Sequence, residues 1–254
     1  MDREFWKHCV EAIRRAQASD LGCDESAFAS NELVVVPRPA VVLYPEYVAL
    51  VVGFGTGTVV SVEAGHLGWV NASRPKKHWN AFNSEFLAGL AAEVERSGVR
   101  TTGHSVSLGF ALAEPPNAER APHGFSLESR DRAWMEEWRA RDQFTNALGD
   151  AVEDDWFDRL RAAFVVFDDQ GEAAAATAVG DDGNGCMEIG LDVRRAWRGQ
   201  GLAHPAVLAA SAWVLEQGAV PYYTCGAANV RSHLVAESCG YRALWSVSGV
   251  ARSV

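Results

Sequence analysis

Three arginines and two glycines lie close together where an apolar strand gives way to an apolar helix. The segment reads LDVRRAWRGQGLAHPAV, from Leu191 to Val207. Glycine lets the backbone approach a ligand closely. A helix start presents unpaired N–H groups and about half a positive charge from the helix dipole. Several such N–H groups beside an arginine favour phosphate or pyrophosphate binding, so the segment predicts a site for a small anionic ligand.

The glycine spacing excludes two common nucleotide-binding motifs. A Walker loop needs GxxxxGK[ST], and no lysine follows here. A dinucleotide fingerprint needs GxGxxG, and after Gly199 and Gly201 the third glycine position holds His204. A second glycine-rich stretch, GFGTG at 53–57, has Thr58 where its last glycine would be. That stretch indicates a hairpin turn between two strands.

The spacing Arg198-x-x-Gly201-x-Ala203 resembles the [RQ]-x-x-G-x-[GA] signature of the GNAT acyl-CoA N-acyltransferase superfamily. Residues 229–241, NVRSHLVAESCGY, resemble the family's N-x-x-[SA]-x7-G-[FY] segment. The residues in register with that segment are Asn229, Ser232, Gly240 and Tyr241. The order hairpin, strand, motif, helix, strand, helix, strand also resembles the C-terminal core of the GNAT fold.

The resemblance implies acetyl-CoA or another acyl-CoA as co-substrate. It assigns the pantetheine arm to the strand end, Leu191, Asp192 and Val193. It assigns the pyrophosphate to the loop and helix start, which comprise Arg198, Gly199, Gln200, Gly201, Leu202 and Ala203. Two later polar residues, Asn229 and Ser232, are assigned to coenzyme A. Arg194 and Arg195 either attract the adenosine phosphate or are solvated surface residues. Asn229 has a helix N-cap as its alternative role.

Acyl transfer to an amine requires the neutral amine. An alkyl amine has a pKa of about 10.4, so deprotonation at pH 7 costs about 4–5 kcal/mol. A carboxylate on the central strand can act as the general base. Glu188 lies on the strand expected at 186–193 and shares a face with Gly190 and Asp192. Glu188 is therefore the candidate base, and a solvated strand carboxylate is the alternative interpretation.

The family's usual general acid is missing. Many members use a tyrosine seven residues after the asparagine of the second segment, and this chain has Ala236 there. Ser232, Cys239, Tyr222 or Tyr223 could substitute, or the thiolate could leave through water. Ser232 is taken as the second candidate catalytic residue. Cys239 has a buried helix position as its alternative.

Apolar periodicity predicts an α/β protein with a mixed sheet in two domains. We expect a smaller or degenerate GNAT-like α/β domain over 1–125 and a GNAT catalytic domain over 126–254, divided near the proline-rich segment 113–124. Helices are expected at 3–18, 78–98, 129–144, 154–163, 201–217 and 230–239. Strands are expected at 33–36, 40–44, 47–54, 57–65, 104–112, 186–193, 221–225 and 241–250, with a hairpin over 164–180.

Composition narrows the functional classes. The net charge of −10 disfavours nucleic acid as a partner. No apolar run reaches the roughly 18 residues of a membrane span, and residues 1–20 lack a signal-peptide core. Five scattered cysteines without CxxC spacing fit a reduced compartment. Seven histidines show no metal-ligand spacing. We therefore expect a cytoplasmic protein without a metal and without nucleic acid or membrane partners, and a homodimer is left open.

These expectations define one function and two alternatives. The first is an N-acyltransferase, most simply an N-acetyltransferase, that moves an acyl group from acyl-CoA to an amine of a small molecule. The second is a catalytically inert coenzyme A-binding sensor or scaffold, favoured slightly by Ala236. The third is a different α/β protein whose strand-to-helix junction binds another phosphate ligand.

Overall fold

The computed structural model of the protein describes residues 2–102, 105–117, 119–149 and 156–253. Contacts divide the chain into two compact units. Unit 1 comprises residues 1–12, 110–224 and 230–242, and unit 2 comprises residues 13–109, 225–229 and 243–254. Four elements have residues in both units: α1 (Arg3–Leu21), β4 (Ser107–Leu112), β9 (Val220–Gly226) and β10 (Tyr241–Ala251). The predicted domain boundary near residue 125 stays a prediction.

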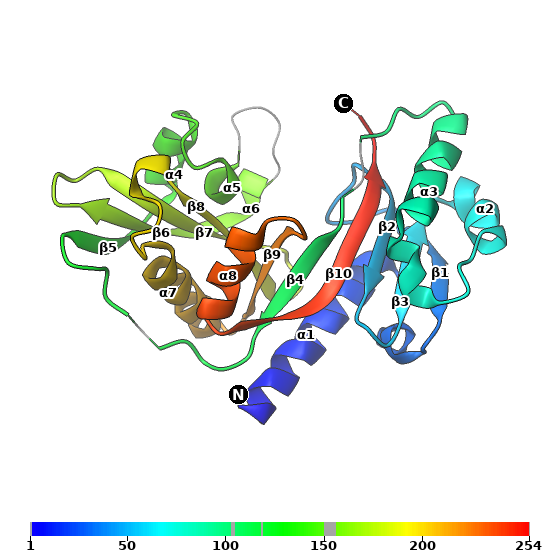
Figure 1. Ribbon diagram of the computed structural model, residues 1–254, viewed down its shortest axis with the longest axis horizontal. Coiled ribbons are helices and arrows are strands. Elements are labelled where there is room, and N and C mark those ends of the chain that lie inside the picture. Colours follow the sequence, from blue (N-terminus) through cyan, green and yellow to red (C-terminus); the bar gives the residue numbers. More distant parts are fainter. Residues whose placement is uncertain (1, 103–104, 118, 150–155, 254) are drawn as a thin grey trace. The chain divides into compact units, whose positions relative to one another are not determined.

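Unit 1 is built on a mixed sheet (Figure 1). Its strands are β5 (Phe125–Arg130), β6 (Leu160–Asp168), β7 (Ala173–Asp181), β8 (Cys186–Val193) and the first part of β9. Strands β5 to β8 pair antiparallel in sequence order, and β8 pairs with β9 in parallel. The helical elements are α4 (Arg132–Arg139), α5 (Thr145–Leu148), α6 (Trp156–Arg159), η4 (Arg195–Trp197), α7 (Ala203–Glu216) and α8 (Val230–Ser238).

Helices cover both faces of the unit 1 sheet (Figure 1). Successive side chains of a strand point to opposite faces. Val165 of β6 packs in one core cluster with Met135, Phe144 and Phe157 from the segment containing α4 to α6. Its neighbour Val166 packs in another cluster, which includes the start of α7. The strands are therefore buried on both sides, which explains their nearly continuous apolar sequence.

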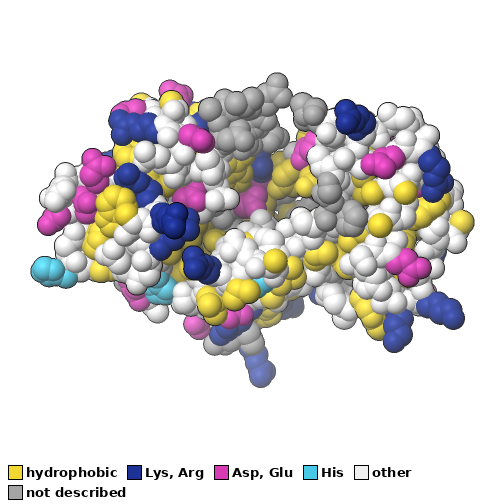
Figure 2. Space-filling view, turned by 45° about the horizontal axis from the view of Figure 1, so that its top comes forward, with side chains coloured by type: hydrophobic (Ala, Val, Ile, Leu, Met, Phe, Trp, Pro, Cys, Tyr) yellow, Lys and Arg dark blue, Asp and Glu magenta, His cyan; other side chains and the backbone are white. Residues whose placement is uncertain are grey.

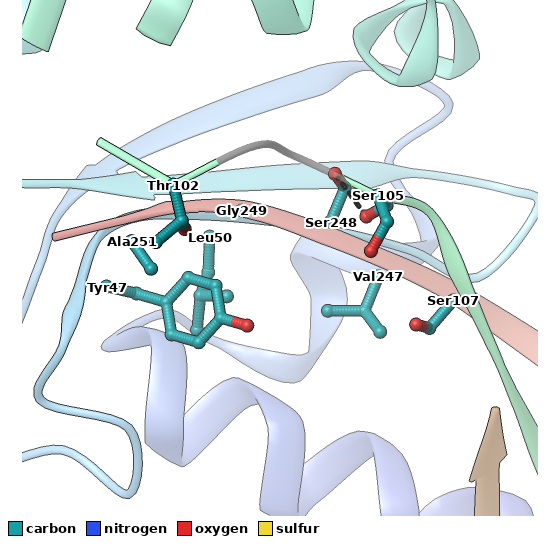
Figure 3. Close-up of a pocket in the computed structure, with 9 residues that line it drawn as sticks. All are labelled: Tyr47, Leu50, Thr102, Ser105, Ser107, Val247, Ser248, Gly249 and Ala251. Atoms are coloured by element: carbon teal, nitrogen blue, oxygen red, sulfur yellow. Dashed lines mark hydrogen bonds between the residues drawn. The ribbon is translucent and has the colours of Figure 1, made fainter. Parts of the chain in front are cut away.

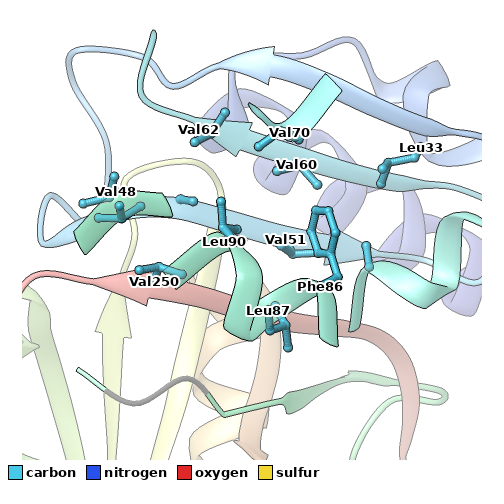
Figure 4. Close-up of a cluster of buried hydrophobic side chains, with 13 residues drawn as sticks. Leu33, Val48, Val51, Val60, Val62, Val70, Phe86, Leu87, Leu90 and Val250 are labelled. Atoms are coloured by element: carbon cyan, nitrogen blue, oxygen red, sulfur yellow. The ribbon is translucent and has the colours of Figure 1, made fainter. Parts of the chain in front are cut away.

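Unit 2 contains the remaining strands and has its own hydrophobic core (Figure 4). Strand β1 (Leu33–Pro37) pairs in parallel with β3 (Thr58–Val62), β3 pairs antiparallel with β2 (Tyr47–Gly53), and β2 pairs antiparallel with β10. Its helical elements are η1 (Glu25–Ala29), η2 (Ala64–His66), α2 (Leu67–Ala72), η3 (His78–Phe82) and α3 (Ser84–Arg96). Phe86, Leu87 and Leu90 of α3 pack on valines of the strands. Both units therefore combine helices with mixed sheets, as the α/β prediction requires.

Two predicted elements of unit 2 are wrong in detail. Residues 40–44 do not form a strand. Prolines flank this segment, Val41 is 91% exposed, and the Leu43 N–H donates to the Asp20 carboxylate instead of to a neighbouring strand. The helix expected over 78–98 is interrupted at Asn83, whose backbone is extended with ψ 147°. The chain therefore forms η3 and then α3.

Two predicted helices of unit 1 are shorter than expected. The segment at 129–144 begins inside strand β5, and its helix starts only at Arg132 because Asp131 caps it by accepting the Trp134 N–H at 3.1 Å. The helix expected at 154–163 has residues 154 and 155 outside the described residues. Its remainder divides into α6 and the start of β6 at Leu160. The strand expected at 104–112 begins at Ser107, and residue 104 also lies outside the described part.

Charged side chains of both signs are interspersed over the face drawn in Figure 2. In the described part of the chain, no helix is both long and apolar enough to cross a membrane.

Candidate functional site

The loop between β8 and α7 has an open backbone. Gly199 and Gly201 have φ angles of +83° and +74°, in the left-handed region that favours glycine. A Cβ built on either residue would meet no described atom within 4 Å. Leu202, which follows, is 1% exposed and anchors the loop in the apolar interior. The loop therefore combines a fixed anchor with backbone that a ligand can approach closely.

The start of α7 adds donors to the same place. Helix α7 is 14 residues long, and among the described residues no side chain caps its N-terminus at Leu202. The N–H groups of Ala203 and His204, in the first turn, have no partner within the helix itself. Pro205, the third helical residue, has no N–H to satisfy. This arrangement attracts an anion through backbone N–H groups and the helix dipole.

The three arginines near the loop have different surroundings. Arg194 donates through Nη1 to the Ala173 carbonyl at 2.8 Å and lies over the Trp197 ring at 4.7 Å, so its side chain braces the end of β8. Arg198 donates through Nε to the Val193 carbonyl at 3.0 Å, which keeps its charge beside the loop. Arg195 is exposed. Arg194 is therefore held by the protein, and adenosine-phosphate attraction by Arg194 and Arg195 stays a prediction.

Strands β8 and β9 separate at the middle of β8. Their parallel register comprises Cys186–Val220, Met187–Pro221 and Glu188–Tyr222, whereas β8 continues to Val193. On its other side β8 stays paired with β7 as far as Val193. The register with β9 therefore ends at Glu188, and the part of β8 predicted to contact the pantetheine arm, residues 191–193, lies beyond this point.

Glu188 lies where the two strands separate. Its Oε1 accepts a short hydrogen bond from the Thr224 hydroxyl, and its Oε2 lies 3.4 Å from the Tyr222 hydroxyl. Tyr222 and Thr224 alternate along β9 and so point to the same face of the sheet. The side chain of Glu188 is partly exposed. A carboxylate in this position can accept a proton from a substrate that enters between the strands.

A second carboxylate lies behind Glu188. Asp182, the second of the residues DDGNG between β7 and β8, accepts a hydrogen bond from the Tyr222 hydroxyl at 2.5 Å and pairs with Arg159 Nη1 at 2.5 Å. Only 2% of its side chain is exposed. Burial and then the charge of Glu188 raise the pKa of Asp182 to about 7. Sequence analysis missed this residue because its local sequence indicates only a turn.

Asp192 has a side-chain role as well as a place on the predicted donor strand. Its Oδ2 accepts the N–H groups of Asn146 and Ala147 at 2.7 and 3.0 Å, and its Oδ1 accepts the Asn146 side-chain amide at 2.7 Å. Burial is the main cause of its raised pKa. The segment held in this way lies against β8, since a Cβ on Gly190 would meet the Asn146 carbonyl oxygen at 2.5 Å. The Trp156 indole N–H donates to the Ala147 carbonyl at 2.9 Å. Asp192 therefore holds the segment containing Asn146 and Ala147 against this face of β8.

The structure does not bring Ser232 together with Glu188. The Ser232 hydroxyl shares a hydrogen bond of 2.7 Å with the Tyr223 hydroxyl. Tyr222 and Tyr223 are consecutive on β9 and point to opposite faces, so Ser232 and Glu188 contact tyrosines on different sides of the sheet. Asn229 precedes α8, and its N–H donates to the Gly226 carbonyl at 2.8 Å. The predicted roles of Ser232 and Asn229 remain predictions.

The other candidate acids differ in their access to Glu188. Ala236, at the position of the family's tyrosine, is fully buried. Cys239 is buried, and burial raises its pKa to about 12, so its thiol is a poor acid and a poor nucleophile. Tyr222 is the candidate that lies beside Glu188.

A pocket also lies in unit 2 (Figure 3). Its lining is mainly hydroxyl-bearing and apolar side chains from β2, the segment before β4, the first residue of β4, and β10. None of its nine lining residues is among the predicted site residues. Among the described residues, no cluster of three or more His, Cys, Asp or Glu side chains is placed to hold a metal ion.

Comparison with known proteins gives a family match for part of the chain. The model of the acetyltransferase (GNAT) family matches residues 127–241. An X-ray structure of a Drosophila protein is 14% identical over 98% of this chain and 90% of its own, with a TM-score of 0.56, a likeness of fold. A GCN5-related N-acetyltransferase-like protein from Streptococcus suis is 19% identical over 67% of this chain and 69% of its own, with a TM-score of 0.49.

A tandem GNAT protein from the clavulanic acid biosynthesis pathway is 18% identical over 65% of this chain and 58% of its own, with a TM-score of 0.46. No curated protein matches the chain in sequence. The expectation of a degenerate GNAT-like domain over 1–125 stays a prediction. The motif of Arg198 to Ala203 follows strand β8 and opens helix α7 inside the matched region. Residues 127–241 of this chain therefore belong to the acetyltransferase (GNAT) family.

Proposed function

We propose that this protein transfers an acyl group, most simply acetyl, from acyl-CoA to an amine of a small molecule. The observation that carries the proposal is the open loop of Gly199 and Gly201, which leads into α7 beyond the point where the β8–β9 register ends. Its N–H groups suit a pyrophosphate. The strand end at 191–193 then suits the pantetheine arm, and the acyl group reaches the region of Glu188. Membership of the GNAT family supports the same reaction class.

Glu188 is the proposed general base. The amine must lose a proton before it attacks the thioester, and at pH 7 that loss costs about 4–5 kcal/mol for an alkyl amine with a pKa of about 10.4. A carboxylate directly beside the amine or one water away provides the acceptor. A hydrogen bond from the Thr224 hydroxyl orients the Glu188 carboxylate, and the Tyr222 hydroxyl, which donates to Asp182, lies 3.4 Å from Glu188 Oε2. The C–N bond forms as the C–S bond breaks, and coenzyme A leaves as the thiolate.

Calorimetry and thiol release test the proposal together. Acetyl-CoA should bind in calorimetry, and a panel of primary amines should include acceptors that release free coenzyme A thiol. Glu188→Gln should keep acetyl-CoA binding and lower kcat by about 10²–10⁴, the usual contribution of a general base. Absence of binding at millimolar acetyl-CoA would exclude both the transferase and the sensor.

The second candidate function is an inert coenzyme A-binding sensor or scaffold. Ala236, buried where many family members have a tyrosine, is the observation that favours it. Tight acetyl-CoA binding without thiol release from any amine, in wild type and in Ala236→Tyr alike, would support this function over transfer.

A further inference from the structure

A chain of polar side chains runs from the candidate base into the interior of unit 1. The Tyr222 hydroxyl lies 3.4 Å from Glu188 Oε2 and donates to Asp182 Oδ2 at 2.5 Å. Asp182 Oδ1 pairs with Arg159 Nη1 at 2.5 Å. Tyr222 is 4% exposed and the Asp182 side chain 2%, whereas Glu188 is partly exposed. The partly exposed end of this chain is therefore the proposed base, and its buried end is a second carboxylate.

The charges around Asp182 suit a group that gains and loses a proton. The titratable and charged groups that act on it come from three elements: Arg159 on α6, Glu188 on β8 and Tyr222 on β9. Arg159 stays positively charged at all relevant pH values. With both carboxylates ionised, the cluster has one excess negative charge in a mostly buried place. One added proton makes the cluster neutral, so the environment favours holding a single proton between the two acids.

We propose that Asp182 is a positioning residue that resets the base: the proton taken by Glu188 passes through the Tyr222 hydroxyl to Asp182. This inference rests on the proposed acyl transfer. Glu188 Oε2 first takes the proton of the acceptor amine. Its new O–H then donates to the Tyr222 oxygen while the Tyr222 O–H gives its own proton to Asp182 Oδ2. Tyr222 ends unchanged, Glu188 is a carboxylate again, and Asp182 is a neutral acid paired with Arg159 until the proton returns by the same path to solvent after the products leave.

The ionisation of Asp182 fits this role. Its pKa is raised from 3.8 to about 7, first by burial and then by the charge of Glu188. Its carboxylate, the form that accepts a proton, therefore predominates only above about pH 7. We expect transfer to weaken as the pH falls through that region. An ordinary aspartate would stay ionised down to about pH 4 and would produce no such loss near neutrality.

Three variants test the relay by their pH profiles. Asp182→Asn removes the proton acceptor and its negative charge. Tyr222→Phe removes only the connecting hydroxyl and leaves the Asp182–Arg159 pair intact. Asp181→Asn is the matched control, because Asp181 is the preceding residue and contacts Arg161 and the Gly183 N–H instead.

With an amine that the wild type acetylates, both relay variants should lower kcat on the order of tenfold or more, with little change in KM for acetyl-CoA. In Asp182→Asn the acidic limb of the kcat–pH profile, the fall in kcat as the pH drops through about 7, should also be lost, because the group whose protonation produces it is absent. Asp181→Asn should keep the wild-type limb. A purely structural role of Asp182 would change stability or KM and leave the limb in place. If both Asp182→Asn and Tyr222→Phe keep the kcat and the acidic limb of the wild type, the relay is overturned and the proposed transferase function stands.

A carboxyl titration separates failure of the relay from failure of the proposed function. In ¹³C-labelled wild-type protein, the side-chain carboxyl of Asp182 should titrate near pH 7, and Glu188→Gln should displace its curve to lower pH, because the charge of Glu188 raises the pKa of Asp182. If the wild type releases no thiol with any amine, the proposed function fails. A curve displaced in Glu188→Gln would then still support the coupling of the two acids, and an unchanged curve would overturn it.

Discussion

Replacement of Gly201 by alanine separates backbone strain from ligand binding. Gly201 has φ +74° and open space around the position of a Cβ. An L-residue in the left-handed region costs about 1–2 kcal/mol, and about 1 kcal/mol shifts the Tm of a chain of this size by about 2–4 °C. We therefore expect Gly201→Ala to lower Tm by about 2–8 °C and to leave the protein folded at 25 °C.

The effect on acetyl-CoA should be larger than this strain. The new methyl group projects into the space where the pyrophosphate is proposed to lie and separates it from the loop N–H groups. A hydrogen bond to a charged group contributes about 1.5–3 kcal/mol, and about 1.4 kcal/mol is a tenfold change in Kd. Loss of one such contact should therefore raise the Kd for acetyl-CoA by about 10–100-fold.

Gly171→Ala provides the matched control. Gly171, in the β6–β7 turn, has φ +80° and equally open surroundings. It should show a similar fall in Tm by scanning fluorimetry and an unchanged Kd by calorimetry. If Gly201→Ala binds acetyl-CoA within twofold of the wild type, the loop is not the pyrophosphate site and the reasoning from open backbone is refuted.

Three further predictions concern the framework of the two units. Asp192→Ala should lower the free energy of unfolding by about 1–3 kcal/mol in urea, because the Asn146 N–H loses its acceptor; an unchanged midpoint would show that the carboxylate is dispensable. Cys239, buried with a pKa of about 12, should have a thiolate fraction of about 10⁻⁴ at pH 8 and stay unlabelled by a thiol reagent until guanidine is added; rapid native labelling would contradict its burial. Gly109→Ala places a Cβ 1.9 Å from the Trp245 ring and should cost at least about 1–3 kcal/mol, seen as a lower Tm with altered tryptophan fluorescence; wild-type stability would mean that the indole moves freely.

The loop of Gly199 and Gly201 was predictable from sequence because its geometry is local. A strand, a turn with two glycines and an apolar helix follow one another within about 30 residues, and the structure has β8, the loop and α7 at those places. The same holds for the hairpin turn at 169–171 between β6 and β7. Both features depend on the order of neighbouring residues, which the sequence displays directly.

The surroundings of Glu188 were not predictable in this way. The contact between Asp182 and Tyr222 joins residues 40 apart and depends on the registers of β7, β8 and β9 together. The parallel register that sets Tyr222 opposite Glu188 has only three residue pairs, and no turn between the two strands fixes it. Pattern analysis placed Glu188 on the correct face but gave no indication of a second, buried acid behind it.

The polar groups beside Glu188 affect whether Ala236 indicates an inert protein. A thiol has a pKa of about 8.5 and an alkyl amine one of about 10.4. Near neutral pH the thiolate can therefore leave with little help, whereas the amine must give up its proton at a cost of about 4–5 kcal/mol. Loss of a tyrosine that protonates the leaving group thus removes help from the easier proton transfer. The hydroxyls of Tyr222 and Thr224 contact Glu188, the residue proposed for the harder transfer. Ala236 is consequently a weaker argument for an inert protein than its departure from the family pattern suggests.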